Sequence, residues 1–382
     1  MVRSPADAPV VGMVGAGQLA RMTHQAAVGL GLSLRVLADR STDSAALVVA
    51  DVVVADYRDL DDLLDFAAGC DVLTFDHEHV PAEHLRALVD KGVVVRPGPE
   101  ALLYAQDKVA MRNRLAELGL PVPRWGRIDE PGDVADFAAE TGWPVVVKAV
   151  TGGYDGRGVW LVEGLGAAER LMTAAGATAL YVEERVAVRR ELAAVVARRP
   201  SGEVAAWPVV ETVQQDGICA EVLAPARGLA TDQAEEARRL AVTIADRLDV
   251  VGDLAVELFE TADGLLVNEL AMRPHNSGHW TIEGARTSQF EQHLRAVLDW
   301  PLGKTTRTAP AVAMANVLGG TDPGLAGRLP AVLGSDPGVR VHLYGKEVRP
   351  GRKVGHVTVL GDDPHDVRRR AQRAAAALAG PA

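Results

Sequence analysis

Two glutamates, Glu257 and Glu269, stand in two apolar runs on either side of the turn Ala262–Gly264. A three-residue hairpin loop at this turn would use its glycine for the positive φ and would pair Thr261 with Leu265. Counting back from that pair places Glu257 directly opposite Glu269. Like charges facing each other across strands are unfavourable, and a cation between them removes the conflict. Oxygen ligands suit Mg²⁺ held with substrate phosphates, so the pair predicts a magnesium site, with a solvated hairpin as the alternative.

A dense run of polar side chains follows the second strand of this hairpin. It contains Arg273, His275, Asn276, Ser277 and His279. These residues offer cations and hydrogen-bond donors at the exit of the strand, which argues against a merely exposed hairpin.

Two lysines and a glycine-rich loop precede the hairpin. Lys148 interrupts the apolar strand Pro144–Val150 and needs a partner, because an isolated buried ammonium is costly. Lys108 lies in the first turn of a predicted helix, Gln106–Leu118, where the helix dipole disfavours a cation; it either serves a nearby anion or is solvated. The run TGGYDGRGV at 151–159 predicts a lid whose backbone closes over phosphates, or alternatively a simple hairpin turn.

The composition is that of a soluble globular protein. Its 382 residues allow two or three domains, and 48% are hydrophobic and 24% charged. The net charge of −11 disfavours a nucleic-acid partner. The two cysteines, Cys70 and Cys219, give neither a disulfide framework nor a zinc site. The apolar run Pro9–Ala16 is a predicted strand and not a secretory signal, and no run reaches the roughly 18 apolar residues of a membrane helix, so we expect a cytoplasmic protein.

The first hundred residues alternate β-branched runs with helical patterns, which predicts a doubly wound parallel sheet. The expected strands are Val10–Val14, Leu34–Ala38, Val52–Ala55, Val72–Phe75 and Val93–Arg96, with helices beginning at Gln18, Leu60 and Ala82. The first strand ends in GAGQLA, a glycine turn that aims backbone N–H groups at an anion. A phosphate-bearing substrate would fit this turn, as would a nicotinamide dinucleotide with Asp39 as its ribose-binding acid.

The fourth strand runs into FDHEHVP, which puts charged and polar side chains at the carboxyl edge of the sheet, where open α/β folds bind ligands. These residues are Asp76, His77, Glu78 and His79. The histidine spacing matches no strong metal-ligand pattern. Glu78 as the acceptor for a ribose hydroxyl is the preferred interpretation.

The rest of the chain has a different architecture. Three antiparallel strands and an amphipathic helix are expected at 190–198, 204–213, 218–223 and 231–247. From about residue 302 the composition shifts to Gly, Pro and Thr, and a β-rich region ends in a basic hairpin. Its tip carries Lys346, Arg349, Arg352 and Lys353, which form either a solvated turn or an anion site. We expect domains at 1–105, 106–305 and 306–382.

Together these parts could bind ATP through Mg²⁺ and pass its γ-phosphoryl group to an oxyanion. At this point the chain resembles the ATP-grasp superfamily and, within it, the 5-(carboxyamino)imidazole ribonucleotide synthases of purine biosynthesis. The motifs that carry the resemblance are GAGQL (15–19), FDHEHVP (75–81), QDK (106–108), PVVVKAVTGGYDGRG (144–158), VEE (182–184), NELAMRPHNSGHWT (268–281) and RPGRKVGH (349–356). They extend over essentially all of the chain, and the pattern NELAxRxHNSGHWT is the most specific.

The resemblance implies an α/β enzyme with a Rossmann-like N-terminal domain, a central ATP-grasp domain of antiparallel sheets and helices, and a small β-rich C-terminal domain. It implies an ATP-dependent ligase that carboxylates the exocyclic amine of 5-aminoimidazole ribonucleotide with bicarbonate, through carboxyphosphate. A closed lid would keep water from that intermediate. ATP and Mg²⁺ are the implied cofactors, and a homodimer is the implied assembly.

The resemblance also implies roles for individual residues. ATP would be bound by Lys108, Lys148, Gly153, Tyr154, Asp155, Gly156, Arg157, Gly158, Val159, Glu183, Glu184, Arg185, Val186, Glu191, Gln214, Asn268 and Glu269, and Mg²⁺ by Glu257 and Glu269. The catalytic set would be Tyr154, Asp155, Arg273, His275 and Asn276, with Arg273 orienting bicarbonate and Asp155 as the candidate base. The ribonucleotide would contact Gln18, Glu78, Tyr154, Lys346, Arg352 and Lys353.

Three positions depart from related patterns. Ala271 replaces the asparagine of many ATP-grasp enzymes, as is usual in this family, and leaves the number of Mg²⁺ ions open. Gln214 replaces a histidine near the nucleotide, and Asp76-His77 replaces Glu-Phe, which leaves the ribonucleotide contacts there open. The remaining alternatives are another ATP-grasp ligase, such as formate-dependent glycinamide ribonucleotide transformylase, a nicotinamide-dependent oxidoreductase, and a nucleotide-binding regulator without turnover.

Overall fold

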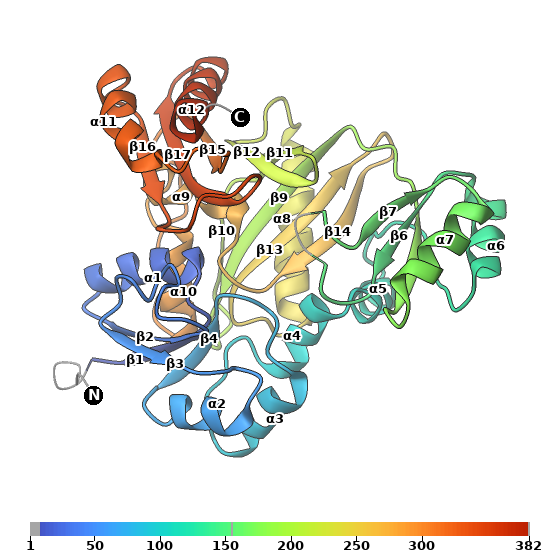
Figure 1. The fold of residues 1–382 in the computed structure, drawn as a ribbon, viewed down its shortest axis with the longest axis horizontal. Helices are drawn as coiled ribbons and strands as arrows, with labels where there is room; N and C mark the ends of the chain where they lie inside the picture. Colours follow the sequence, from blue (N-terminus) through green and yellow to red (C-terminus); the bar gives the residue numbers. More distant parts are fainter. Residues whose placement is uncertain (1–7, 154–155, 381–382) are drawn as a thin grey trace.

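The computed structural model describes residues 8–153 and 156–380, and the strands in these ranges form three sheets with helices packed on their faces (Figure 1). The predicted mixed α/β class, with a parallel N-terminal sheet and antiparallel sheets beyond it, is confirmed. Within the described ranges, no helix is long and apolar enough to span a membrane.

The N-terminal part forms a parallel sheet in the order β3-β2-β1-β4. Its elements are β1 (Val10–Val14), α1 (Gln18–Gly29), β2 (Ser33–Ala38), β3 (Asp51–Val54), α2 (Leu60–Ala67), β4 (Val72–Phe75) and α3 (Ala82–Asp90). The predicted fifth strand, Val93–Arg96, is wrong, since only a single bridge joins Val95 to Leu73. Pro97 follows at once and lacks the N–H that a longer ladder would need.

The helix predicted at 106–118 is present as the second of two consecutive helices, and the first was not predicted. They are α4 (Pro99–Gln106) and α5 (Lys108–Glu117). Asp107 separates them in an extended conformation, and its carboxylate caps α5 by accepting a hydrogen bond from Ala110 N at 2.8 Å. Lys108 N donates to the carbonyl of Val150 at 3.0 Å, which joins the start of α5 to the strand that carries Lys148.

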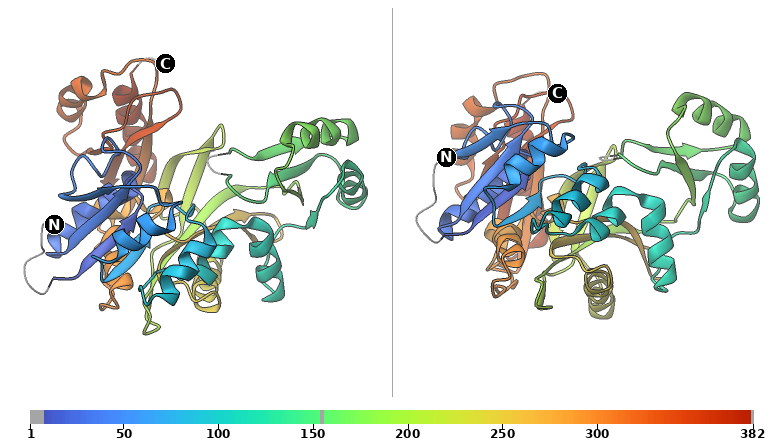
Figure 2. Two further views of the ribbon diagram at one scale, coloured as in Figure 1. Left: turned by 60° about the horizontal axis from the view of Figure 1, so that its bottom comes forward. Right: turned by 90° about the horizontal axis from the view of Figure 1, so that it is seen from below.

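A small lobe stands apart from the rest of the molecule (Figure 2). Its elements are β5 (Trp125–Arg127), α6 (Pro131–Thr141), β6 (Val145–Ala149), β7 (Val159–Val162), α7 (Leu165–Ala175) and β8 (Leu180–Glu184). The strands form an antiparallel sheet in the order β5-β8-β6-β7, and an apolar core that includes Val134, Val147 and Val182 joins it to α6 and α7. β6 and β7 pair as a hairpin, so the glycine-rich segment is its connecting loop.

The central sheet has the order β14-β13-β9-β11-β12-β15-β17-β16, with β10 paired to β9. Its first elements are β9 (Arg190–Arg198), β10 (Val204–Ala206), β11 (Val210–Gln215), β12 (Ile218–Ala224), α8 (Thr231–Arg247), β13 (Gly252–Glu260) and β14 (Leu265–Ala271). The predicted strand 204–213 is two strands, because Pro208 lacks a ladder donor. Beyond β14 come the 3₁₀ helix η1 (Asn276–Gly278), α9 (Thr281–Gly284) and α10 (Gln289–Val297).

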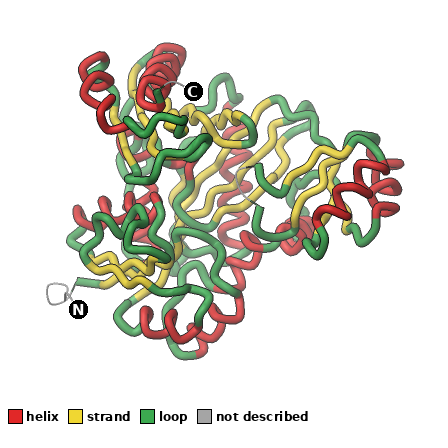
Figure 3. The backbone as a smooth tube through the Cα atoms, viewed as in Figure 1, coloured by secondary structure: helices red, strands yellow, loops and turns green. Residues whose placement is uncertain are grey.

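The C-terminal part continues this sheet. It contains β15 (Ala311–Leu318), α11 (Leu325–Ser335), β16 (Arg340–Leu343), β17 (Lys353–Gly361) and α12 (Pro364–Ala379). β15 pairs with β12, so one continuous sheet runs past residue 305, and helices α11 and α12 lie at its C-terminal end (Figure 3). The predicted domain boundaries stay predictions.

His293 of α10 ties the N-terminal sheet to the central one. Its Nδ1 accepts a hydrogen bond from Asp253 N at 3.1 Å, so the ring proton belongs on Nε2, which lies 2.7 Å from Thr74 Oγ1. Burial lowers the pKa of His293 to about 3, so the ring is neutral at pH 7. This contact holds β4, and the segment Asp76–His79 that follows it, next to β13.

Candidate functional site

A cleft of about 1200 Å³ opens where the three sheets meet. Most of the residues given a role from sequence line it: Gln18, Glu78, Lys108, Lys148, Gly153, Gly156, Val159, Glu183, Glu184, Arg185, Val186, Glu191, Gln214, Glu257, Asn268, Glu269, Arg273, His275, Asn276 and Lys353. Four others lie outside this lining: Arg157, Gly158, Lys346 and Arg352. Tyr154 and Asp155 fall outside the described residues.

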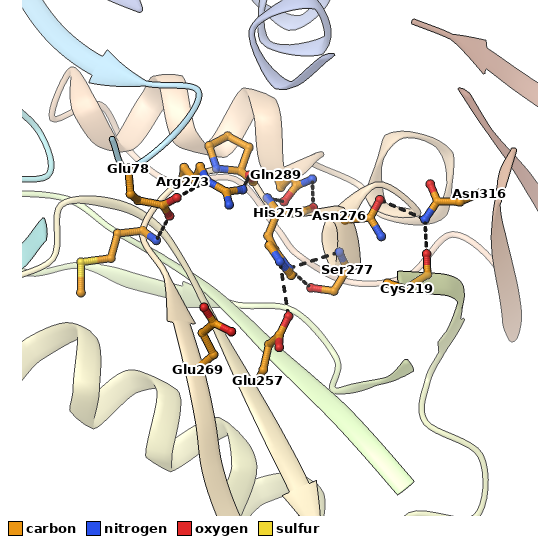
Figure 4. Close-up of polar contacts among 12 residues, drawn as sticks. Glu78, Cys219, Glu257, Glu269, Arg273, His275, Asn276, Ser277, Gln289 and Asn316 are labelled. Carbon is orange, nitrogen blue, oxygen red and sulfur yellow. Dashed lines mark hydrogen bonds and ion pairs between the residues drawn. The ribbon is translucent and has the colours of Figure 1, made fainter. Parts of the chain in front are cut away.

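Glu257 and Glu269 lie opposite each other on β13 and β14, as predicted, and both point toward the segment with Arg273 and His275 (Figure 4). The predicted pairing of Thr261 with Leu265 is wrong, because Glu260 pairs with Leu265 and the loop has four residues. Thr261 stays in the loop because its hydroxyl accepts a hydrogen bond from Asp263 N and donates one to the carbonyl of Gly264.

A β-bulge at Asn268 restores the opposition of the two glutamates. Leu258 pairs with Val267 and Glu257 with Glu269, so Asn268 is the extra residue. Regular alternation would send Asn268 and Glu269 to opposite faces, whereas the bulge lets both line the cleft. This irregularity accounts for the place of Asn268, which simple alternation does not.

Lys108 and Lys148 each have a partner on β14. Lys108 Nζ lies 2.6 Å from Glu269 Oε1, and Lys148 Nζ donates to Asn268 Oδ1 at 3.2 Å. Lys148 also pairs with Glu183 Oε2 at 2.6 Å, which supplies the partner that a buried ammonium needs. The two ammonium groups therefore stand beside the carboxylate pair.

Arg112 is a site residue that the sequence did not reveal. Its guanidinium is wholly buried and lies 2.6 Å from Glu183 Oε1, which also accepts from the Tyr181 hydroxyl at 3.0 Å. Burial raises the pKa of Glu183, but the charges of Arg112 and Lys148 outweigh it and leave that pKa below its usual value. Both Glu183 oxygens are thus occupied, and the residue holds Lys148 in place. The available signal was helical spacing, since Arg112 follows Lys108 by four positions.

One end of the cleft is formed by the end of β8 and the segment after it, together with β9 and β11. Glu184, Arg185 and Val186 line it, and Gln214 hydrogen-bonds to Glu191. Burial raises the pKa of Glu191, and this amide opposes the rise. The predicted contact of Gln214 with the nucleotide stays a prediction.

The β6–β7 loop reaches over this end of the cleft. Gly153, Gly156 and Val159 line it, and Gly156 has a φ of +75°. A Cβ on Gly156 would lie 3.1 Å from the Cα of Gly217 in the β11–β12 turn, so only glycine allows so close an approach. The segment is therefore both a hairpin loop and part of the cleft wall.

Asp76 fills the glycine turn of the first strand. Its carboxylate accepts hydrogen bonds from the N–H groups of Gly17 and, at 3.3 Å, of Ala20. The N-terminus of α1 therefore already holds an anion that belongs to the protein. Two of the N–H groups that a ligand phosphate or a dinucleotide would need at this turn are therefore already hydrogen-bonded, so neither ligand is favoured there.

The exit of β14 carries the remaining polar groups. Arg273 Nε donates to Glu78 Oε2 at 2.7 Å, so Glu78 fixes this guanidinium (Figure 4). His275 Nδ1 accepts from Ser277 N at 3.4 Å and lies 2.9 Å from the Ser277 hydroxyl, which assigns the ring proton to Nε2, 3.4 Å from Glu257 Oε1. Burial and the charge of Arg273 lower the pKa of His275 to about 3, so the ring is neutral at pH 7.

The basic C-terminal loop meets α1 at the rim of the cleft. Lys346 Nζ donates to Gln18 Oε1, and Lys353 lines the cleft. Arg352 instead donates to the carbonyl of Glu347 at 3.4 Å, within its own loop. Of the three predicted phosphate ligands, Lys346 contacts Gln18 and Lys353 lines the cleft, whereas Arg352 contacts its own loop.

The carboxylate pair fits a divalent cation shared with phosphates. Burial and the charge of Glu269 raise the pKa of Glu257 to about 8. A cation between the two carboxylates would relieve their repulsion. Within the described ranges, no group of three or more His, Cys, Asp or Glu side chains could hold a metal by itself. Two carboxylates with the remaining ligands from phosphate and water is the usual protein contribution to a Mg²⁺–nucleotide site.

Three family models match consecutive parts of the chain. They describe a ribonucleotide synthetase preATP-grasp domain at 9–106, an ATP-grasp domain at 113–290 and a phosphoribosylaminoimidazole carboxylase C-terminal domain at 312–370. The N5-carboxyaminoimidazole ribonucleotide synthase of Mycobacterium tuberculosis is 58% identical over 374 residues, which cover 96% of this chain and 87% of that protein. The chain belongs to the N5-carboxyaminoimidazole ribonucleotide synthase family. The predicted family is therefore confirmed.

Solved structures of this family share the whole fold. The synthase from Aspergillus clavatus complexed with ATP is 33% identical, with a TM-score of 0.90 and coverage of 97% of this chain and 98% of that one. The same fungal enzyme with ADP and 5-aminoimidazole ribonucleotide gives 31% identity and a TM-score of 0.89, covering 97% of this chain and 99% of that one. The structural similarity extends over all three sheets.

Proposed function

We propose that the protein catalyses the ATP-dependent carboxylation of 5-aminoimidazole ribonucleotide by bicarbonate in purine biosynthesis, giving 5-(carboxyamino)imidazole ribonucleotide, ADP and phosphate. One observation carries the proposal: the facing carboxylates, their two lysines and the polar exit of β14 line a single cleft. The name of the Mycobacterium tuberculosis relative and the ligands of the Aspergillus clavatus structures support the same reaction.

ATP binds with its phosphates beside Lys108 and Lys148. Its adenine lies along 184–186, and its ribose lies at Glu191 and Gln214, all of which line the cleft. Glu257 and Glu269 hold Mg²⁺, which neutralises charge on the transferring phosphoryl group when bound. Arg112 and Glu183 keep Lys148 in position from behind.

The reaction has two steps. A bicarbonate oxygen attacks the γ-phosphorus of ATP, and ADP leaves. The exocyclic amine of the ribonucleotide then attacks the carboxyl carbon of carboxyphosphate, or CO₂ released from it, while phosphate departs with the bridging oxygen and the amine loses a proton. Arg273 orients bicarbonate and the intermediate, with His275 and Asn276 beside it. Tyr154 and Asp155, proposed to contact the amine, lie outside the described residues.

The ribonucleotide binds between the N-terminal and C-terminal parts. Gln18 and Glu78 contact it from the N-terminal side, and Lys346 and Lys353 contact its phosphate. Arg352 is included in this proposal on the family resemblance, and it would have to turn away from the carbonyl of Glu347. A cytoplasmic homodimer without nucleic-acid partners completes the proposal, supported by the family and the acidic net charge.

Substrate dependence tests this function. We expect phosphate release from ATP to require both aminoimidazole ribonucleotide and bicarbonate, measured with CO₂-depleted buffers as the control. Activity with glycinamide ribonucleotide and formate would favour the other ATP-grasp ligase. Tight NADH or NADPH binding without phosphate release would instead favour an oxidoreductase.

A further inference from the structure

Asn316, on the C-terminal strand β15, reaches the site from behind Asn276 (Figure 4). Its Nδ2 donates to the main-chain carbonyl of Cys219 at 2.7 Å and to Asn276 Oδ1 at 3.1 Å. Both asparagines are buried, with 6% of Asn316 and 9% of Asn276 exposed. Asn276 lines the cleft and Asn316 does not, so any effect of Asn316 on a ligand passes through its neighbour.

The carbonyl of Cys219 fixes the orientation of both amides. A carbonyl oxygen only accepts hydrogen bonds, so the Asn316 group that faces it is the NH₂ group. The second N–H of that group needs an acceptor, which assigns the near atom of Asn276 as Oδ1. Nδ2 of Asn276 must then point away from Asn316. A rotation of Asn276 by 180° would bring two NH₂ groups together.

Asn276 Nδ2 is a donor that lacks a strong acceptor. The described residues supply no hydrogen-bond partner for this buried atom. The Cys219 thiol lies beside the same amide, but sulfur is a weak acceptor. A buried unsatisfied donor is costly, so a ligand that offers an oxygen there recovers this free energy.

The surroundings favour an anionic oxygen. Asn276 follows Arg273 by three positions at the exit of β14, on the opposite side of His275 in Figure 4. Arg273 is held by Glu78, whose carboxylate accepts a hydrogen bond from its Nε at 2.7 Å. An oxyanion between the guanidinium and a fixed neutral N–H donor would be bound from two sides.

We propose that Asn316 is a positioning residue that holds Asn276 as a hydrogen-bond donor to the carboxyl oxygens of bicarbonate or carboxyphosphate. This inference rests on the proposed function. It gives the C-terminal part of the sheet a role at the bicarbonate end of the cleft, separate from the ribonucleotide phosphate.

The substitution Asn316→Leu keeps the approximate shape and removes both donors. We expect kcat/KM for bicarbonate to fall about ten-fold or more, as for a lost hydrogen bond to a charged group, while the KM values for ATP and ribonucleotide stay within about two-fold. A rise in the KM for bicarbonate would mean that Asn276 donates to bound bicarbonate. A fall in kcat would mean that it donates to carboxyphosphate. Thr358→Val is the matched control, because Thr358 is a buried residue on the neighbouring strand β17 whose hydroxyl has no partner.

A double-mutant cycle with Asn276→Ala separates positioning from general damage to the fold. If Asn316 acts through Asn276, Asn316→Leu adds no further loss of bicarbonate kcat/KM in the Asn276→Ala background. Additive losses, an unchanged Asn316→Leu enzyme, or an equal rise in KM for ATP would overturn the inference. Should Asn316→Leu fail to fold, Asn316→Ser is used, because its single donor cannot serve both carbonyl groups. Wild-type enzyme without bicarbonate dependence would instead overturn the proposed function.

Discussion

At the scale of single residues, the carboxylates of Glu257 and Glu269 are the centre of the proposed Mg²⁺–ATP site. They face each other across two strands, and burial together with the charge of Glu269 raises the pKa of Glu257. Lys108 pairs with Glu269 at 2.6 Å but leaves Glu257 next to a neutral histidine. The pair is therefore short of positive charge, and a divalent cation is the natural complement.

Mg²⁺ affinity of the ATP-free protein should depend on pH. The pKa of Glu257 is raised to about 8, so the carboxyl is protonated below that pH and Mg²⁺ must displace the proton. Affinity should therefore rise with pH, by up to about ten-fold per unit, and level off above about pH 8. Calorimetric titration with Mg²⁺ or Mn²⁺ measures this. The control Glu257→Gln should bind weakly without the pH dependence, and a flat wild-type profile from about pH 6 to 9 would contradict the metal assignment.

Glu269→Gln should abolish most turnover. The substitution keeps the shape but removes one of the two metal-binding charges and the partner of Lys108, and we expect kcat to fall at least about 100-fold. Raised Mg²⁺ should restore part of the activity. Glu100→Gln is the control for a lost carboxylate, since Glu100 lies on the surface in an ion pair with Arg86. Wild-type activity of Glu269→Gln at low Mg²⁺ would rule out the proposed role.

At the scale of elements, several features could be predicted because their signals are local. The β1–α1 glycine turn and the strand with Lys148 follow from nearby residues. The predicted opposition of Glu257 and Glu269 is correct although the predicted pairing next to the loop is not, because two register shifts cancel. The hairpin register could not be predicted, because a four-residue loop and the bulge at Asn268 shift it in opposite directions. Contacts between distant residues were missed for a similar reason. Arg112 meets Glu183 across 71 positions, and Asn316 meets Asn276 across 40.

Helix α5 depends on the buried pair of Arg112 and Glu183. Removing one partner leaves an uncompensated buried charge, so Arg112→Met should lower the free energy of unfolding by about 3–5 kcal/mol. Arg114→Met on the same helix is the matched control, because Arg114 is partly exposed in a surface ion pair with Glu117 and should change stability by less than about 0.5 kcal/mol. Urea denaturation of the ATP-free protein compares the two. Equal effects would show that the buried pair is not what holds α5.

At the scale of the whole molecule, the cleft exists only where three parts of the chain meet. The small lobe supplies Lys148, the central sheet supplies the carboxylates and, at the start of β17, Lys353, and the N-terminal part supplies Glu78. Lys346 reaches Gln18 across 328 positions, and β15 extends the central sheet beyond the predicted domain boundary. Composition predicted separate regions, but not that one sheet would join two of them, since strand pairing at this distance has no local signal.

Transfer of oxygen from bicarbonate to phosphate tests the central claim most directly. If bicarbonate attacks the γ-phosphorus within this cleft, the bridging oxygen of carboxyphosphate leaves with phosphate. The reaction of ¹⁸O-labelled bicarbonate in unlabelled water, followed by mass spectrometry of the released phosphate, should therefore give one ¹⁸O atom for each ATP consumed. Phosphate without ¹⁸O would mean that its fourth oxygen comes from water, which then attacks ATP directly, and it would contradict the account.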